Sequence, residues 1–555
     1  MGARSLYWVT LIALCWLLGY SATGGVAPPE VKPPLTVQWI YSMGPGGRGT
    51  TAPVVESGQV YITYDGELRC LDAVTGAEQW KFAPKGVRVT TAPVVWEKTV
   101  IVGADDSSVY GLSISDGKQV WEQACAGPVG GDPIILDKLL MFAAQDMVYA
   151  MVPEGGAVKW ICSLRSPVAD GPVTDGSMLY FLCQDGTLQS VDAAEGRYRW
   201  TAILHTGPNA FPPVVADRRV IVAGGKTLVA VSRSGAVVWS REMPVGIGGR
   251  PTVVADTLYV PCVSGQGNPE RPRYQAMDHL PPTEGEIYSL YARSGSADPS
   301  AVLRVIGAAT APPLLTGQLL YAGTGQALVY ALDDSTGRVI WTYRCLSPDQ
   351  GLSGATTYGI YAPIVSAGGS LYCLTGDGNL YCFSAGAPDS AGPVFGELKP
   401  EPGSALPGKK AVVVSFASAD EGSGVEPDSV QATYDGQAMK VYYDVATGEG
   451  SFNIPSPKDG SHILKVSAKD YRGNSGSTEW SFLSDMTIKP PAAERPAAGT
   501  ARGRGGTQGA AAAGRGGGGA GGAGRGGGGR GGGGRGGGGR GGGGRGGGGR
   551  GGRMG

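Results

Sequence analysis

Histidine is scarce in this sequence and cysteines are never closely paired, which excludes several classes of metal and redox site. His205, His279 and His462 are the only His among 555 residues, and no Cys-x-x-Cys spacing occurs. Structural zinc sites and covalent haem attachment depend on such spacings. With so few His, no Ser-His-Asp arrangement is evident either. We therefore predict no metal site and no catalytic residue.

Long apolar runs are missing after the N-terminus. The run Leu6–Leu18 follows Arg4 and precedes the small residues 21–25. It is short for a membrane span, which needs about 20 apolar residues, and it has the order of a secretory signal. We predict a signal peptide over residues 1–24, cleaved near Ala22 to Gly25; an uncleaved anchor is the other interpretation. The mature chain is then secreted, periplasmic or at the cell surface, with no transmembrane span after the signal.

Acidic residues are absent from Ala501 to Gly555. This stretch carries ten Arg, so the rest of the chain has a net charge of about −11. It also lacks the apolar residues that would offset chain entropy, and we predict that residues 486–555 form a disordered Gly/Arg-rich tail. A cationic tail favours anionic surfaces. No aromatic residues interleave with the Arg to stack on bases, which argues against nucleic acid.

A motif repeated about every 40 residues organises the rest of the chain. It is clearest at Asp72–Trp80, Asp192–Trp200 and Asp333–Trp341, and weaker copies keep only a Gly four residues before a Trp. Each unit holds four short β-branched or aromatic runs separated by Gly, Asp and Ser turns. Such repeats are typical of propeller blades. We predict an all-β chain with an eight-bladed β-propeller over residues 36–386.

The Trp of each repeat is predicted to dock one blade on the next. An outer-strand Trp can lay its ring across the neighbouring blade, while the Gly supplies a positive φ and the Asp caps the turn. The last unit, Tyr361–Ser384, has three strands, so the strand around Trp39 is predicted to complete it and close the ring. The predicted docking residues are Trp39, Trp80, Trp121, Trp160, Trp200, Trp239 and Trp341.

Asp-x-x-Thr-Gly-x-x-x-Trp at 72–80 and 333–341 resembles the docking motif of the quinoprotein repeat. That family includes dehydrogenases that use pyrroloquinoline quinone (PQQ) with calcium, and non-catalytic propellers such as the one in the outer-membrane barrel-assembly machine. The dehydrogenases place a vicinal Cys pair over the cofactor, and this chain has no adjacent Cys residues. The resemblance implies an exported, non-catalytic scaffold without a cofactor that binds protein or glycan in the cell envelope. A divergent PQQ-dependent dehydrogenase is the alternative.

Polar residues just before the inner strands are the candidate binding group. They would line the mouth of the propeller as a small funnel of mixed charge, or else they are ordinary polar loop residues. Two insertions, 263–286 and 347–358, are either binding loops or tolerated surface loops. The candidate funnel residues are Arg88, Asp132, Asp170, Asn209 and Arg250.

One disulfide is suggested by hairpin geometry. If Asp377-Gly378 is a two-residue turn, Cys373 faces Cys382 across the strand pair, where side chains lie closest. An exported protein permits such a bond. Both residues otherwise read as small buried hydrophobic side chains.

A second domain is predicted after the propeller. Six candidate strands between 408 and 485 suggest an immunoglobulin-like β-sandwich, with Pro-rich linkers at 25–35 and 387–407. Its Asp470-to-Asn474 segment resembles secreted bacterial modules of that type. Asp470 and Asn474 could bind calcium with Asp420 or Glu421, but a turn-capping role is favoured.

Overall fold

The fold is described from a computed structural model that covers residues 31–44, 51–206, 210–264, 284–346, 351–352, 358–408 and 410–488. Within these ranges the chain is built of strands, and its one helical element is the 3-10 turn η1 (Pro427–Ser429). The predicted all-β class is confirmed. No helix in the described residues is long and apolar enough to cross a membrane.

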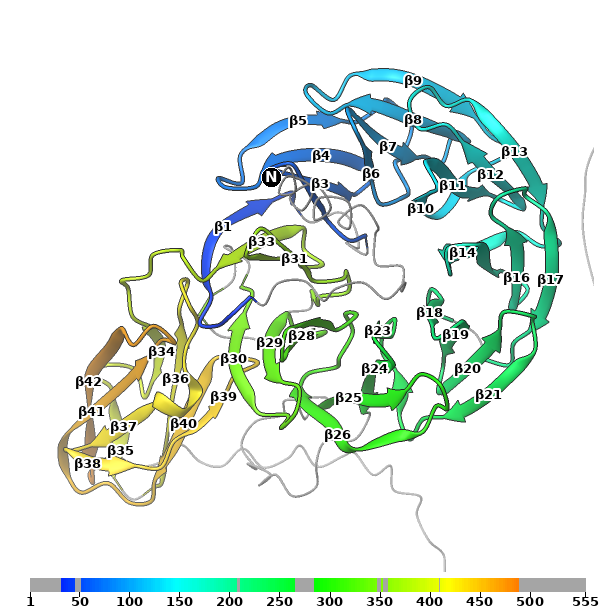
Figure 1. The fold of residues 1–555 in the computed structure, drawn as a ribbon. Helices are drawn as coiled ribbons and strands as arrows, with labels where there is room; N and C mark the ends of the chain where they lie inside the picture. The colour runs from blue at the N-terminus through cyan, green and yellow to red at the C-terminus, as the bar shows by residue number, and fades with distance from the viewer. Residues whose placement is uncertain are drawn as a thin grey trace, which may run out of the picture. The chain divides into compact units, whose positions relative to one another are not determined.

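The strands from 36 to 384 form successive antiparallel sheets around a ring, with the first strand of each sheet facing the centre (Figure 1). The sheets of the first half are β2 (Val54–Glu56), β3 (Gln59–Tyr64), β4 (Glu67–Asp72) and β5 (Glu78–Phe82); β6 (Val94–Trp96), β7 (Thr99–Gly103), β8 (Ser108–Ser113) and β9 (Gln119–Ala124); β10 (Val129–Leu136), β11 (Leu139–Ala144), β12 (Met147–Met151) and β13 (Val158–Ser163); and β14 (Val168–Thr174), β15 (Met178–Cys183), β16 (Thr187–Asp192) and β17 (Tyr198–Ile203). This arrangement is a β-propeller.

The second half continues in the same way. Its sheets are β18 (Val214–Ala216), β19 (Arg219–Gly224), β20 (Thr227–Ser232) and β21 (Val237–Glu242); β22 (Gly246–Ile247), β23 (Thr252–Val254), β24 (Thr257–Ser264), β25 (Glu284–Tyr291) and β26 (Ala297–Ile306); β27 (Leu314–Thr316), β28 (Leu319–Gly323), β29 (Leu328–Asp333) and β30 (Val339–Arg344); and β31 (Val365–Ala367), β32 (Ser370–Leu374) and β33 (Asn379–Ser384) with β1 (Thr36–Ser42). Most of the two predicted insertions, including His279, lies outside the described residues.

The core of the ring lies between neighbouring sheets. Middle strands such as β7 and β15 are buried almost throughout, because both of their faces are covered. Outer strands such as β9 and β21 are exposed or half-buried. This explains why the middle strands are near-continuous apolar runs, while the outer strands carry charged and amide residues.

The ring closes through strands from the two ends of the propeller. β1 pairs antiparallel with β33, from Thr36 opposite Ser384 to Ser42 opposite Asn379. The strand around Trp39 therefore completes the last sheet, as predicted from the sequence. A closed ring leaves no blade with a missing outer strand.

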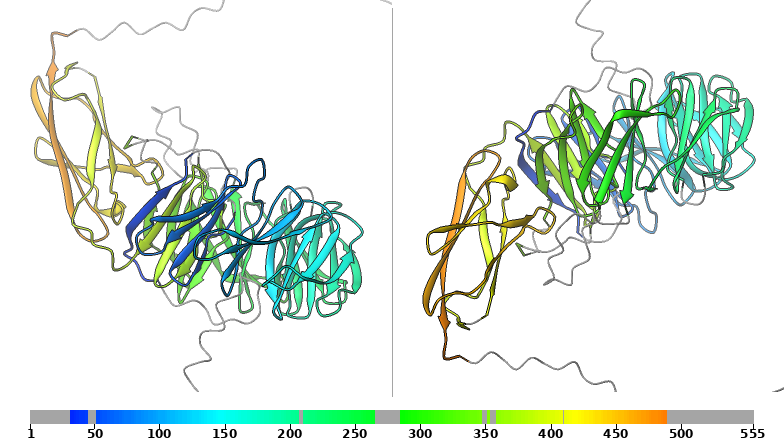
Figure 2. Two further views of the ribbon diagram at one scale, coloured as in Figure 1. Left: turned by 90° about the horizontal axis from the view of Figure 1, so that it is seen from above. Right: turned by 90° about the horizontal axis from the view of Figure 1, so that it is seen from below.

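The later strands form two sheets packed face to face, drawn yellow to orange in Figure 2. One holds β34 (Val394–Lys399), β36 (Val412–Ala419), β40 (Glu449–Ile454) and β39 (Tyr442–Asp444); the other holds β35 (Ala405–Pro407), β42 (Ser475–Asp485), β41 (Gly460–Lys469), β37 (Gln431–Tyr434) and β38 (Gln437–Met439). Phe416, Leu464 and Trp480 belong to the shared core. The predicted linker 387–407 is corrected here, because β34 and β35 make part of it a component of these sheets.

Candidate functional site

The repeat motif forms the contact between neighbouring blades. The ring of Trp39 covers Gly76 of the next sheet, and a Cβ atom placed on Gly76 would lie 2.6 Å from that ring. Gly76 also has a φ of 71°, so two separate constraints call for glycine here. The Oδ1 atom of Asp72 accepts the N–H groups of Val74 at 3.0 Å and Thr75 at 2.8 Å. Motif residues are therefore used for docking.

The same arrangement recurs around the ring. Trp80, Trp121, Trp160, Trp200 and Trp239 cover Gly117, Gly156, Gly196, Gly235 and Gly295, respectively. Four of the indole groups, from Trp39, Trp80, Trp200 and Trp239, also donate to a carbonyl of the next sheet. The indole N–H groups of Trp121 and Trp160 are buried without a partner. In β26 the motif Trp is missing, and Leu303 contacts Gly337 instead.

Trp341 breaks this pattern. Its side chain is fully buried, and its Nε1 donates at 2.9 Å to the carbonyl of Ser423, which follows β36. The carbonyl of the adjacent Gly422 accepts the N–H of Val37 at 3.1 Å. Because the outer strand of the last sheet is β1, no β-turn from β33 into an outer strand is available to receive Trp341. The loop 420–424 takes that role.

Two arginines add hydrogen bonds at this junction between the propeller and the two-sheet domain. The Nη2 atom of Arg344 donates to the carbonyls of Leu352 at 2.6 Å and Ser418 at 3.1 Å. The Nε atom of Arg472 donates to the Thr36 hydroxyl at 3.1 Å, and its Nη2 donates to the Ala385 carbonyl. The two-sheet domain thus contacts both strands that meet at the ring closure, β1 and the end of β33.

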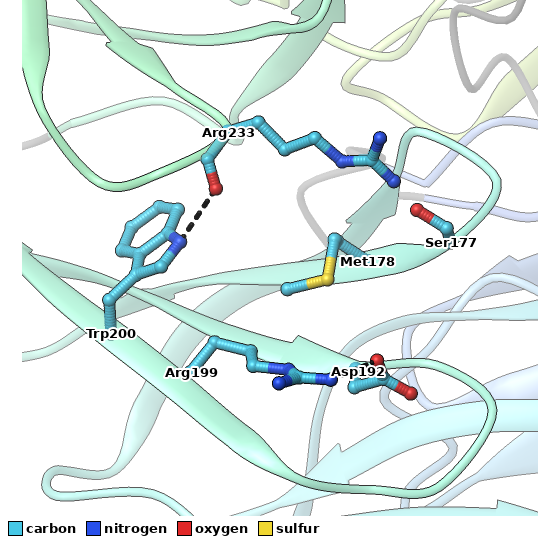
Figure 3. A pocket seen from close by; sticks show the side chains of 6 residues that line it. All are labelled: Ser177, Met178, Asp192, Arg199, Trp200 and Arg233. Carbon is cyan, nitrogen blue, oxygen red and sulfur yellow. Dashed lines mark hydrogen bonds and ion pairs between the residues drawn. The ribbon is translucent and has the colours of Figure 1, made fainter.

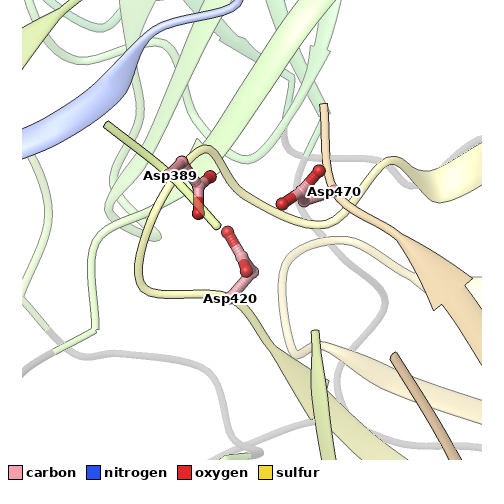
Figure 4. A group of neighbouring side chains, drawn as sticks. All are labelled: Asp389, Asp420 and Asp470. Carbon is pink, nitrogen blue, oxygen red and sulfur yellow. The ribbon is translucent and has the colours of Figure 1, made fainter. Parts of the chain in front are cut away.

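Three carboxylates gather beside this junction (Figure 4). One oxygen from each of Asp389, Asp420 and Asp470 lies within 4.8 Å of the others. Asp420 Oδ2 accepts the N–H groups of Gly422 and Gly424, and Asp470 Oδ1 accepts those of Arg472 and Asn474. Burial, followed by the charges of Asp389 and Asp470, raises the pKa of Asp420 to about 6.

These hydrogen bonds confirm the predicted capping role of Asp470. Asn474 Nδ2 also donates to Asp470 Oδ2 at 2.7 Å, so the two residues predicted to act together do so within one turn. Glu421, the alternative to Asp420 in the predicted group, takes part through its backbone. Its carbonyl accepts a hydrogen bond from the Tyr343 hydroxyl at 3.2 Å. Asp389 was missed from the sequence because it follows the propeller, far along the chain from Asp470.

On the inner strands the structure brings three of the five predicted funnel residues together. A Cβ atom on Gly131 would lie 2.0 Å from the Gly171 carbonyl oxygen, so β10 and β14 approach closely there. Asp132 follows Gly131 on β10 and accepts the Ala92 N–H at 2.7 Å. Asp170 on β14 accepts the N–H of Gly171 at 2.7 Å. Arg250, between β22 and β23, donates to the Pro213 carbonyl at 3.0 Å.

These three charges influence one another. Burial and then the charge of Asp132 raise the pKa of Asp170 to about 6, against the opposing effect of Arg250. Although Asp132 retains exposed surface, the surrounding protein desolvates its carboxyl and raises its pKa. Burial lowers the pKa of Arg250, and the two carboxylates oppose that effect. The inner strands therefore carry two carboxylates, and the single guanidinium of Arg250 neutralises their negative charge only in part.

The other two predicted funnel residues do not join this group. Arg88 is exposed and makes an ion pair with Asp65 at 3.2 Å, while its N–H donates to Asp105. Asn209 lies outside the described residues.

A cleft between the sheets β14–β17 and β18–β21 contains mutually bonded polar groups (Figure 3). Arg199 Nη2 lies 2.6 Å from Asp192 Oδ2, and Trp200 Nε1 donates to the Arg233 carbonyl at 2.8 Å. The Arg233 side chain pairs with Asp175 at 3.0 Å. Ser177 and Met178 complete the lining. Since these contacts tie two blades together, we interpret the cleft as a docking contact.

The predicted Cys373–Cys382 disulfide is wrong. Cys373 pairs with Tyr381, and Cys382 with Tyr372, so the two cysteines lie on opposite faces of the sheet. The connection is a three-residue loop, Gly376–Gly378, in which the Thr375 N–H donates to the Asn379 carbonyl. This loop shifts the register by one residue from the predicted pairing, which is enough to reverse the faces.

The fold and the docking motif define a propeller of the quinoprotein-repeat class. Three overlapping stretches, 35–167, 126–211 and 184–388, match the family described as Outer membrane protein assembly factor BamB, and the chain belongs to that family. The predicted family resemblance is thereby confirmed.

Individual relatives are more distant. The chain is similar to Outer membrane protein assembly factor BamB of Burkholderia pseudomallei, with 31% identity over 24% of this chain and 35% of that protein. The same factor of Shewanella oneidensis is 26% identical over 41% and 62%. The crystal structure of BamB from Moraxella catarrhalis aligns with a TM-score of 0.46 and 14% identity over 64% and 99%. This chain thus spans about a third to three-fifths of the curated relatives' length.

Proposed function

We propose that the protein is an exported, non-catalytic scaffold that binds a protein partner in the cell envelope. Family membership supports this role, because the relatives are named as outer membrane assembly factors. The repeat motif supports it as well, since its Asp, Gly and Trp residues are engaged in docking. In this proposal the signal peptide is removed and the chain acts in the periplasm or at the cell surface.

The proposed architecture is an eight-bladed propeller followed by an immunoglobulin-like sandwich and a disordered tail. The sandwich acts as a structural partner of the ring closure, where Trp341 and Arg472 make their contacts. The tail adds a cationic tether for anionic surfaces of the envelope.

The acidic pair on the inner strands is the observation that carries the binding proposal. Asp132 and Asp170 lie on neighbouring strands with Arg250 as their shared counter-charge, and the raised pKa of Asp170 reflects poor solvation. Cationic side chains of a partner would relieve this repulsion. We therefore expect the partner to present Lys or Arg to the centre of the ring.

Cross-linking of the full chain to its partner in envelope fractions tests this proposal. The Asp132→Asn/Asp170→Asn double variant should lose most of the cross-linked protein partner. Glu242→Gln is the matched control, because it removes one exposed charge from the outer strand β21 and should retain the partner. Equal retention by both variants, or capture of a glycan in place of a protein, would contradict the proposal.

A PQQ-dependent dehydrogenase with calcium is the second candidate. The described inner strands do not fit that group well: they gather two carboxylates, which would repel the acid groups of the quinone, around one Arg. The three-carboxylate group lies beside the sandwich and is used for turn capping. Adding PQQ and calcium should leave the melting temperature of the scaffold unchanged, whereas an increase would favour the dehydrogenase.

A further inference from the structure

Two thiols meet at the ring closure. Cys345 follows β30, and Cys373 lies in β32 of the closing sheet. They are 3% and 0% exposed and belong to one core cluster with Trp341 and Phe383. The two side chains lie close enough that Cys373 contributes to raising the pKa of the Cys345 thiol. Cys382, the other cysteine of the closing sheet, instead contacts Ser370 and Tyr372.

The backbones that carry these thiols are tied together independently of the sulfur atoms. Tyr381 pairs with Cys373 across the sheet. The hydroxyl of the same Tyr381 donates at 2.6 Å to the carbonyl of Leu346, the residue after Cys345. The N–H of Cys345 donates to the Ala327 carbonyl at 2.9 Å. One tyrosine thus fixes the two cysteine positions relative to each other.

We propose that Cys345 and Cys373 form a disulfide that joins the sheet β27–β30 to the closing sheet. The oxidant is a low-molecular-weight or protein disulfide of the oxidising compartment to which the chain is exported. One cysteine thiolate attacks that disulfide and releases one thiol, and the second cysteine then displaces the other. The S–S bond forms, two S–H bonds are lost, and the oxidant takes both electrons and both protons as two thiols.

Burial determines when this exchange takes place. Burial first, and then the contact with Cys373, raises the pKa of the Cys345 thiol, so the folded site holds little reactive thiolate. The exchange therefore belongs to folding, before the sheets pack together. Afterwards the same burial shields the bond from reductants. Since the ring closes non-covalently through β1 and β33, a covalent link beside this closure opposes its opening.

Peptide mapping of the full chain tests the proposal directly. The chain is refolded with oxidised and reduced glutathione, denatured, alkylated and digested with trypsin. No Lys or Arg lies between Arg344 and Lys399, so Cys345, Cys373 and Cys382 remain on one peptide. We expect this peptide to carry one alkyl group, with the loss of two hydrogens, about 2 Da. Chymotrypsin, which cuts after Tyr358 and Tyr372, should then yield Cys345 and Cys373 in linked fragments. Three alkyl groups, or a bond to Cys382, would overturn the assignment.

Melting of variants supplies the second measurement. Oxidised wild-type protein should melt several degrees above the reduced protein, because the bond restricts the unfolded chain. Cys345→Ser and Cys373→Ser should each abolish the difference. Cys262→Ser is the matched control, since Cys262 is fully buried in a different cluster that contains no second cysteine, and this variant should retain the difference. Loss of this difference in melting temperature in the Cys262→Ser variant would contradict the proposal. If a variant fails to fold, peptide mapping of the wild-type protein alone tests whether the disulfide forms.

Discussion

Trp341 is the docking tryptophan whose indole contacts a different part of the chain. The six other motif tryptophans cover a glycine of the following sheet, and Trp341 instead donates to the Ser423 carbonyl. It is 0% exposed, whereas Trp200 is half-buried. The loss of unfolding free energy on substituting a docking tryptophan should therefore differ from one blade to another.

We predict that Trp341→Phe costs more than Trp200→Phe. Both lose a hydrogen bond from Nε1, worth about 1 kcal/mol. The fully buried Trp341 also leaves a cavity and an unpaired buried carbonyl, which should bring its loss to about 2–4 kcal/mol. Chemical denaturation of both variants measures the difference in unfolding free energy. Equal losses would mean that the contact with Ser423 does not stabilise the ring.

The raised pKa of Asp170 predicts a pH-dependent stability. Its carboxyl titrates near 3.8 when unfolded and near 6 when folded, so between these values the folded protein binds more protons. The contribution of Asp170 to stability therefore falls as pH rises from about 4 to 6. Asp170→Asn should remove this decrease and be relatively more stable above pH 6, by up to about 2 kcal/mol. Melting temperatures from pH 4 to pH 7 check this, and parallel curves for wild type and variant would refute it.

At the scale of single elements, the turn between β4 and β5 illustrates what a repeated glycine does. Its positive φ could be inferred from the sequence, because a tight turn needs it. Docking of Trp39 on the next blade was predicted as well, but its exact contact with Gly76 was not, since the ring comes from a strand of a different sheet.

We predict that Gly76→Ala is more damaging than Gly58→Ala. Both glycines have positive φ, 71° and 78°, so both substitutions strain the backbone by about 1 kcal/mol. Only the Gly76 substitution also pushes a methyl group into the Trp39 ring, because nothing lies within 4 Å of a Cβ atom on Gly58. This overlap should add about 1–3 kcal/mol. Thermal or chemical unfolding of the two variants gives the comparison, and similar losses would show that Trp39 moves aside freely.

The hairpin β32–β33 marks a limit of sequence-based prediction at this scale. Both strands were predicted, but the residue pairing was wrong by one position because a three-residue loop joins them. The alternation of side chains shows which residues of one strand share a face. The length of the connecting loop fixes which residues of the two strands lie opposite each other. Cys373 consequently meets Cys345 of the preceding sheet.

At the scale of the whole molecule, the repeat period predicted the ring and its closure by β1, because each blade is a local unit with a fixed spacing. No repeat or motif in the sequence predicted the contact between the ring closure and the loop 420–424. It joins Trp341 and Val37 to residues far along the chain, and only packing brings them together.

The Arg-rich tail is predicted to bind anionic surfaces without stabilising the fold. Deleting residues 491–555 removes eleven Arg and one Glu, and no strand of the described sheets. We expect the melting temperature to stay unchanged, while binding to anionic lipid vesicles at low salt is lost. Neutral vesicles are the control, because electrostatic attraction should be absent there. Retained binding to anionic vesicles after the deletion would contradict a role for the tail.

Local patterns were enough to predict the all-β class, the repeat, the turn chemistry of Asp72 and Gly76, and the strand that closes the ring. These features depend on short-range rules, such as side-chain alternation, positive φ and a constant period. Only the packed structure shows which of the predicted funnel residues interact, namely Asp132, Asp170 and Arg250. It also shows that Asp389 joins Asp420 and Asp470, and that Cys345 lies close to Cys373. Each of these groups comes from separate sheets or loops, so its members meet only through the packing of elements distant in the sequence.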